Sequence, residues 1–246
     1  MILLFTDFGY EGPYVGQMHV VLARDAPDAR VIDLMHDAPA HDPRAAAYML
    51  AALVPDMPER AVCVAVVDPG VGTDRPPVVL EADGRWFVGP GNGLFELVQR
   101  RSTAARQWRI DWKPARLSAS FHGRDLFAPV AAMLARGDKP PGVPFPDGWQ
   151  GAADRHGTDW PGDLAEIIYC DRFGNAMTGL RAVSCAPDAI FSLSGRLIRH
   201  ARVFGEAAPG AVFWYENSIG LVEIALRDGS AAGTLGIGPG DTVVSA

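Results

Sequence analysis

Cysteine is scarce in this chain of 246 residues. The three cysteines, Cys63, Cys170 and Cys185, lie far apart and form no CxxC pair. A disulfide framework needs an even set of cysteines, and cysteine zinc sites draw on closely spaced pairs. The sequence therefore predicts neither of these features, and a reducing, cytoplasmic location is the expectation.

Long apolar runs and an excess of positive charge are also missing. The run AAAYMLAALV at 45–54 falls well short of the roughly 20 apolar residues that a membrane span needs. The opening MILLF lacks the basic segment of an export signal. Lys and Arg total 22 against 29 Asp and Glu, which gives a net charge of −7 and disfavours a polyanion as partner. We expect a folded protein that binds neither membranes nor nucleic acid.

The first half of the chain alternates apolar runs with helical stretches, which is typical of an α/β layer. MILLFT, RVIDL and AVCVAVV predict strands, and residues 13–24, 43–53 and 123–135 predict helices. Asp42 before Pro43 predicts a capped helix start, and Pro55 predicts its end. PVVLEA and RWFVG flank Asp83-Gly84, a pair typical of hairpin turns. We therefore expect an N-terminal α/β domain over residues 1–150 with a central mixed sheet.

A region rich in proline and glycine, residues 137–160, follows this half. Four prolines between 139 and 146 are expected to interrupt any helix or strand pairing. Only short strand-like runs follow, separated by Gly, Asn and Asp: LAEIIY, AIFSL, RLIRHARVF, AVFWYEN, GLVEIAL and DTVVSA. The sequence predicts a linker at 137–160 and a small all-β barrel as the C-terminal domain over residues 160–246.

Polar residues gather at the ends of the apolar runs, where open α/β sheets place their ligand sites. In TDFG, Asp7 follows the first predicted strand and could hold a cation or a ribose diol, or cap a turn. In VVDPGVGTDR, Asp68 and Arg75 lie seven residues apart across a glycine-containing loop and could fold back into a bidentate ion pair. Such a pair could orient a water molecule, or it could only hold the loop together.

Histidines offer two further possibilities. His122 precedes Gly123 near a predicted helix start and could be functional or a satisfied structural residue. His36-Asp37 and His41-Asp42 resemble the paired ligands of a metal phosphohydrolase. The two dipeptides are close in sequence, however, and Asp42 is already needed as a helix cap, so metal ligation is the less favoured interpretation.

The segment CDRFGNAMTG at 170–179 concentrates polar residues in the second half. Asn175 offers the donor and acceptor that an adenine edge requires, and Phe173 can pack on a ring face. The alternative is a turn organised by Asp171. Trp214 and Tyr215 fit a core or an interface better than a ligand contact.

Six segments in this order, TDFG, VDPGVGTDR, FVGPGNGLF, FHGRDLFAP, DRFGN and NSIGLVEIA, closely resemble the S-adenosylmethionine hydroxide adenosyltransferase (S-adenosylmethionine hydrolase) family, relatives of fluorinase and chlorinase. The match spans nearly the whole chain. The resemblance implies hydrolysis of S-adenosyl-L-methionine to adenosine and L-methionine, by attack of activated water or hydroxide at the ribose C5′. It further implies a homotrimer with each site between the N-terminal domain of one subunit and the C-terminal domain of its neighbour.

The resemblance also assigns roles to individual residues. Asp68, Arg75 and His122 match the family's water-activating set. The residues that match its substrate contacts are Asp7 for the ribose, Phe173 and Asn175 for adenine, and Asp171 and Ser218 for the amino-acid end. No metal and no organic cofactor is expected.

Three other functions remain open at this point. A halogenase on the same substrate would have an aromatic residue in place of Asp68 and a small hydroxyl residue near His122. A sensor would bind S-adenosylmethionine or adenosine without turnover, and a metal phosphohydrolase would use the two His-Asp dipeptides. The chain also departs from the family pattern at Gly91, which is often Asp, and at Ser230, where Asn is more usual.

Overall fold

The computed structural model describes residues 1–145 and 157–246. The chain divides into two compact units, Met1–Thr158 and Asp159–Ala246. Part of the expected linker, residues 146–156, lies outside the described residues. None of the helices in the described ranges is long and apolar enough to cross a membrane.

The first unit is built on a seven-stranded sheet of order β2-β1-β3-β5-β4-β6-β7. Its strands are β1 (Ile2–Thr6), β2 (Val31–Met35), β3 (Val62–Val66), β4 (Pro77–Ala82), β5 (Arg85–Pro90), β6 (Ala105–Ile110) and β7 (Gly142–Pro144). β1 pairs parallel with β2 and β3, and β3 pairs parallel with β5, whereas β4, β6 and β7 run antiparallel to their neighbours. The expected mixed sheet is confirmed.

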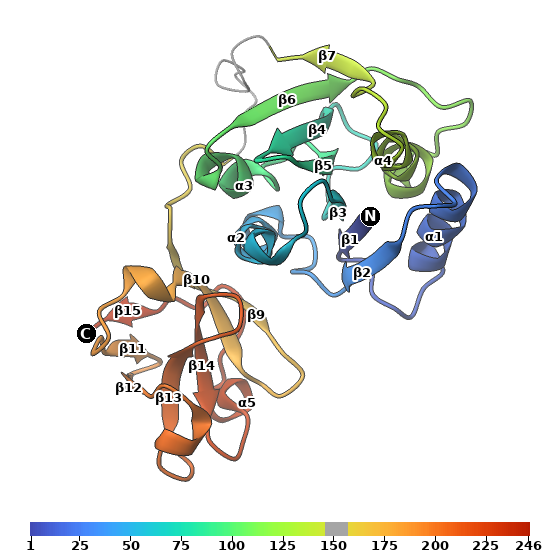
Figure 1. Cartoon of the computed structure of the whole chain (residues 1–246). Coiled ribbons are helices and arrows are strands. Elements are labelled where there is room, and N and C mark those ends of the chain that lie inside the picture. The colour runs from blue at the N-terminus through green and yellow to red at the C-terminus, as the bar shows by residue number, and fades with distance from the viewer. Residues whose placement is uncertain (146–156) are drawn as a thin grey trace. The chain divides into compact units, whose positions relative to one another are not determined.

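Helices cover both faces of this sheet (Figure 1). They are α1 (Tyr14–Asp25), α2 (Pro43–Leu53), η1 (Val54–Asp56), α3 (Glu96–Arg101), the π-helical turn η2 (Gly123–Phe127) and α4 (Ala128–Ala135). α1 packs with α4 on one face, and α2 packs with α3 on the other. The Asp42 side chain accepts a hydrogen bond from the Ala45 amide at 2.9 Å, which confirms the predicted cap of α2.

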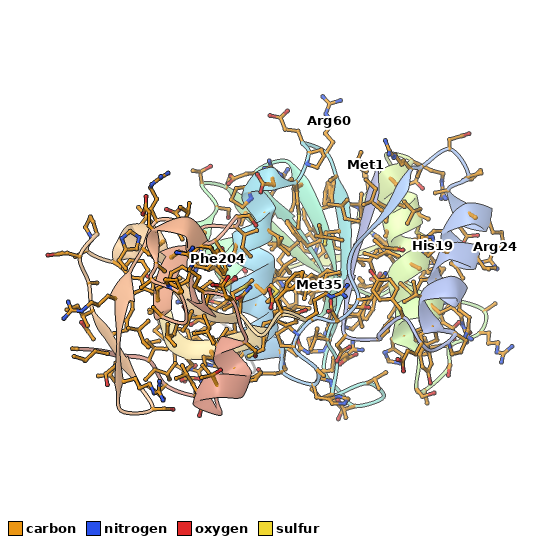
Figure 2. The ribbon with its side chains drawn as sticks, turned by 90° about the horizontal axis from the view of Figure 1, so that it is seen from below. Met1, His19, Arg24, Met35, Arg60 and Phe204 are labelled. Carbon is orange, nitrogen blue, oxygen red and sulfur yellow. The ribbon has the colours of Figure 1, made fainter. Side chains whose placement is uncertain are left out.

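The apolar runs of β1 and β3 are fully buried at the centre of the sheet, because helices cover them on both sides. Figure 2 shows the side chains packed between the sheet and its helices, while Arg24 at the end of α1 points outward. The residues that follow β1 and β3 are therefore anchored on a well-packed core.

The proline-rich stretch contains one strand that the sequence reasoning excluded. β7 pairs antiparallel with the edge strand β6, with Val143 opposite Arg109 and Pro144 opposite Trp108. Proline is tolerated because β7 is the last strand of the sheet and one of its sides needs no donor. The expectation of no regular pairing between 139 and 146 was wrong for these three residues.

The second unit holds another seven-stranded mixed sheet, of order β15-β11-β12-β13-β14-β10-β9. Its strands are β9 (Leu164–Cys170), β10 (Ala176–Arg181), β11 (Phe191–Leu193), β12 (Arg196–His200), β13 (Val212–Glu216), β14 (Leu221–Leu226) and β15 (Val244–Ser245). Glu166 of β9 forms a bridge with Thr242, just before β15, so the two ends of the sheet are linked. The unit also contains η3 (Ala182–Ser184), η4 (Phe204–Glu206) and the short helix α5 (Ala231–Leu235), so it is not purely β.

Candidate active site

The ends of β1 and β3 bring two carboxylates to one edge of the first sheet. The strands are parallel and in register, with Thr6 opposite Val66, so the residues after them emerge side by side. Asp7 and Asp68 both line a cavity of about 280 Å³ at this edge. The strand-end position predicted from the sequence is therefore where the structure has a cavity.

Arg75 and His122 complete a hydrogen-bonded group with Asp68. The Arg75 Nε donates to Asp68 Oδ1 at 3.0 Å and its Nη2 donates to Asp68 Oδ2, which is the expected bidentate pair. The same Nη2 lies 2.9 Å from His122 Nδ1. The side chains of Arg75 and Asp68 are only 6% and 5% exposed, so their ion pair is screened little by solvent. His122 and Asp68 line the cavity, and Arg75 joins them.

The hydrogen bond to Arg75 determines the form of His122. A guanidinium can only donate, so His122 Nδ1 must accept, and the neutral ring then carries its hydrogen on Nε2. Burial lowers the pKa of His122, and the positive charge of Arg75 lowers it further, against the opposing effects of Asp68 and Asp125. His122 is therefore held neutral, with an N–H donor remaining on the ring.

Glycines allow the loop after β3 to return Arg75 to Asp68. Gly72 has a φ of 80°, and a Cβ there would stand 2.7 Å from the carbonyl oxygen of Ala119. The Thr73 hydroxyl donates to the Gly70 carbonyl at 2.7 Å and tightens the turn. The close approach of the 70–75 loop to the segment before His122 thus depends on the absence of a side chain at residue 72.

Asp125 lies in the first turn of η2. Its carboxylate accepts the Ser118 amide at 2.8 Å and forms a bidentate pair with Arg124. These bonds fix the segment that leads into His122. A neighbouring carboxylate thereby positions the ring without touching it.

His41 is a cavity residue that the sequence analysis considered only as a metal ligand. Its backbone amide donates to Asp7 Oδ2 at 3.0 Å, and its φ of 58° is unusual for a residue with a side chain. The cap formed by Asp42 holds this turn in place. The only sequence feature that could have pointed to His41 as a site residue is its position directly before the Asp42-Pro43 helix start.

Aromatic side chains form one wall of the same cavity. Phe8, Tyr14 and Phe121 all line it, and their rings contact one another with centroids 5.2 to 6.1 Å apart. An apolar wall beside two carboxylates suits a ligand that has both an apolar surface and positive charge. These three residues are not contiguous in the sequence, so no local pattern predicts the wall.

The metal interpretation of the two His-Asp dipeptides finds no support. His36 is fully buried, with Nδ1 2.7 Å from the Thr6 hydroxyl and Nε2 3.1 Å from Asp33 Oδ1. Asp42 caps α2. Among the residues that the structure describes, no group of three or more His, Cys, Asp or Glu side chains could hold a metal ion.

The second unit holds the other group of candidate residues. Asp171 accepts hydrogen bonds from the Phe173 amide, the Asn175 amide and Asn175 Nδ2, each at 2.9 Å. Asn175 is 8% exposed, whereas Phe173 is 69% exposed and Ser218 is also exposed. Asp171 thus forms the turn given as the alternative interpretation, and that turn fixes Asn175 and presents Phe173 to solvent.

The structure gives physical reasons for both departures from the family pattern. Ser230 caps α5, accepting the Gly233 amide at 2.9 Å, a role in which Ser and Asn are equivalent. It also packs against Gly174, where a Cβ would collide with its hydroxyl. At Gly91, a Cβ would stand 2.8 Å from the carbonyl oxygen of Pro76, so the backbone approach in this chain leaves no room for a side chain.

Comparison with known proteins identifies the family. The profile of the SAM hydroxide adenosyltransferase N-terminal domain matches residues 2–143, and that of the C-terminal domain matches residues 165–244. The chain belongs to the SAM hydroxide adenosyltransferase family. It is 40% identical over 252 residues to the (R)-S-adenosyl-L-methionine hydrolase of Thermus thermophilus, covering 97% of this chain and 96% of that one. It is 43% identical over 252 residues to the protein of the same name from Salinispora arenicola, covering 96% and 94%.

Two solved structures share the fold of this chain. An uncharacterized conserved protein from Thermotoga maritima superposes with a TM-score of 0.87 at 28% identity, covering 100% of both chains. A conserved hypothetical protein from Thermus thermophilus superposes with a TM-score of 0.79 at 38% identity, covering 100% of this chain and 99% of that one.

Proposed function

We propose that the protein hydrolyses S-adenosyl-L-methionine to adenosine and L-methionine. Family membership supports the reaction, and the observation that carries it is the buried group of Asp68, Arg75 and His122 at the edge of a cavity. The relatives' printed names specify the (R) form of the substrate, so we extend that preference to this chain.

In the proposed reaction, water attacks the ribose C5′ in line with the sulfonium. The C5′–O bond forms as the C5′–S bond breaks, the electron pair passes to sulfur, and methionine leaves as a neutral thioether. Asp68 accepts the proton that the water loses, because each of its oxygens keeps a lone pair beyond its bond to Arg75, whereas the single acceptor of His122, Nδ1, is already occupied. The Nε2–H of His122 then orients the attacking oxygen. A general base such as Asp68 typically increases the reaction rate by about 10² to 10⁴.

The substrate contacts follow the family resemblance. Asp7 holds the ribose hydroxyls, Asn175 the adenine edge and Phe173 the adenine face, and Asp171 and Ser218 take the amino-acid end. The fixed orientation of Asn175 and the exposure of Phe173 support these roles. The proposed mechanism uses no metal and no organic cofactor.

The proposed assembly is a cytoplasmic homotrimer. The N-terminal domain, residues 1–150, carries the ribose site and the water-activating group, and the C-terminal domain, residues 160–246, is a nearly closed β-barrel that carries the adenine and methionine contacts. The bridge between the two ends of the second sheet supports the barrel. Sites that combine the domains of neighbouring subunits explain why each domain holds only part of the contact set.

The test is product analysis in halide-free buffer with chelator, on separated (R) and (S) sulfonium epimers. The proposal expects adenosine and methionine in equal amounts, formed faster from the (R) epimer. Tight binding without product would establish a sensor instead. Formation of 5′-chloro-5′-deoxyadenosine after chloride is added would establish a halogenase.

A further inference from the structure

The loop between β13 and β14 is closed by one side chain, that of Asn217. Its Oδ1 accepts the amides of Ile219 at 3.1 Å and Leu221 at 2.9 Å. Its backbone amide donates to the Leu221 carbonyl at 2.9 Å, and its carbonyl accepts the Gly220 amide at 3.0 Å. Ser218 is the exposed residue at the start of this turn. Its position therefore depends on the orientation of the Asn217 amide.

Glu223 fixes that orientation from the neighbouring strand. One oxygen of its carboxylate accepts Asn217 Nδ2 at 2.8 Å, and the other accepts the Tyr215 hydroxyl at 2.6 Å. Because the Asn217 Nδ2 is bound to a carboxylate, Oδ1 must face the loop amides, and a flipped amide would put a carbonyl against the Glu223 anion. The carboxylate thus selects one of two orientations.

The burial of Glu223 is costly for the fold. Glu223 is 5% exposed and Asn217 is 9% exposed. Among the described residues, Glu223 forms no ion pair with Lys, Arg or His, so neutral donors alone satisfy it. Burying a carboxylate costs far more than burying an apolar side chain of similar size, and a purely structural role in a β-sheet would be served better by the apolar residue.

Tyr215 is the second donor to the Glu223 carboxylate. Burial raises the pKa of Tyr215, and so do its hydrogen bond to Glu223 and the negative charges of Glu223 and Asp171. The Tyr215 hydroxyl therefore stays protonated at neutral pH and remains a donor to Glu223.

We propose that Glu223 is a positioning residue that, by fixing the Asn217 amide, sets Ser218 in place for the amino-acid end of S-adenosylmethionine. This inference rests on the proposed function. It adds a residue that never touches the substrate and yet determines affinity for the methionine end, while leaving the adenosine end and the water-activating group unchanged.

The experiment compares Glu223→Met, Glu223→Gln and Asn217→Asp with the unmutated protein. Glu223→Met removes the acceptor. Asn217→Asp keeps acceptors for both loop amides and replaces the donor to Glu223 with an oxygen. Both should raise KM for S-adenosylmethionine roughly 10- to 100-fold, the effect of losing a buried hydrogen bond to a charged group. kcat should stay within about threefold, because a contact equally strong in ground and transition states affects KM alone.

Conservative variants separate positioning from general damage. Glu223→Gln can still accept from Asn217 and donate to Tyr215, so its KM should stay near the unmutated value. Tyr215→Phe removes a bond to Glu223 without touching Asn217, so it serves as a matched control with unchanged KM. Adenosine affinity, measured by calorimetry, should be unchanged in all four variants.

Two results would overturn the proposal. One is an unchanged KM in Asn217→Asp, which alters no apolar packing and is informative even if Glu223→Met fails to fold. The other is equal loss of adenosine and S-adenosylmethionine affinity. Absence of turnover by the unmutated protein would instead refute the proposed function, so the two failures are distinguishable.

Discussion

Replacing Asp68 with Asn tests the water-activating group with the least change in shape. The carbonyl of the introduced asparagine could still accept from Arg75 Nε, but its amide would face Arg75 Nη2, donor against donor. One charge-assisted hydrogen bond would be lost where the Asp68 side chain is only 5% exposed, at a cost of about 2 kcal/mol. In a unit of this size that corresponds to a fall in Tm of roughly 4 to 8 °C. Asp68→Ala would leave a buried unpaired guanidinium and cost more, about 3–5 kcal/mol.

The variant should therefore stay folded at room temperature while losing its proton acceptor. We expect kcat to fall by about 10² to 10⁴ with substrate affinity nearly unchanged. Adenosine formation by chromatography gives kcat, calorimetry gives affinity, and a thermal melt reports the fold. If Asp68→Asn kept more than a tenth of the original kcat, Asp68 would not be the base.

Three further predictions concern pH, packing and metals. Because burial and Arg75 lower the pKa of His122 below its ordinary value of about 6.5, the acid limb of kcat/KM should have its midpoint below about pH 6.5; half-maximal activity at about pH 7 or above would contradict this. Gly174→Ala should lower Tm by several degrees more than Gly195→Ala, since both have positive φ but only Gly174 packs against Ser230. Extended dialysis against chelator should leave turnover unchanged, and restoration of lost activity by a divalent metal would reverse the conclusion.

Uninterrupted apolar runs and proline-defined ends made much of the first unit predictable. β1, β3 and α2 were identified from their residues alone, because buried strands leave no polar interruptions and Asp42-Pro43 marks a helix start. β6 was missed because Arg106 and Arg109 interrupt the apolar pattern of ARQWRI, and only Gln107 and Ile110 are buried. β10 was missed because Gly179 suggests a break, whereas its missing side chain lets Leu164 of β9 approach.

The candidate site was predictable in its parts and not in its assembly. The seven-residue spacing of Asp68 and Arg75 across glycines indicates a folded-back pair, and that pair is present. Nothing local shows that His122, 47 residues beyond Arg75, accepts from the same guanidinium. That contact depends on the close approach of two loops at Gly72, a tertiary feature that short-range patterns do not encode.

The most direct test of the central claim is turnover in water enriched in heavy oxygen, with mass spectrometry of both products. Attack of water at C5′ predicts one heavy oxygen atom in the 5′-hydroxyl of adenosine and none in methionine. Unlabelled adenosine, or label in the methionine product, would contradict the proposed role of Asp68, Arg75 and His122 in delivering water to the ribose.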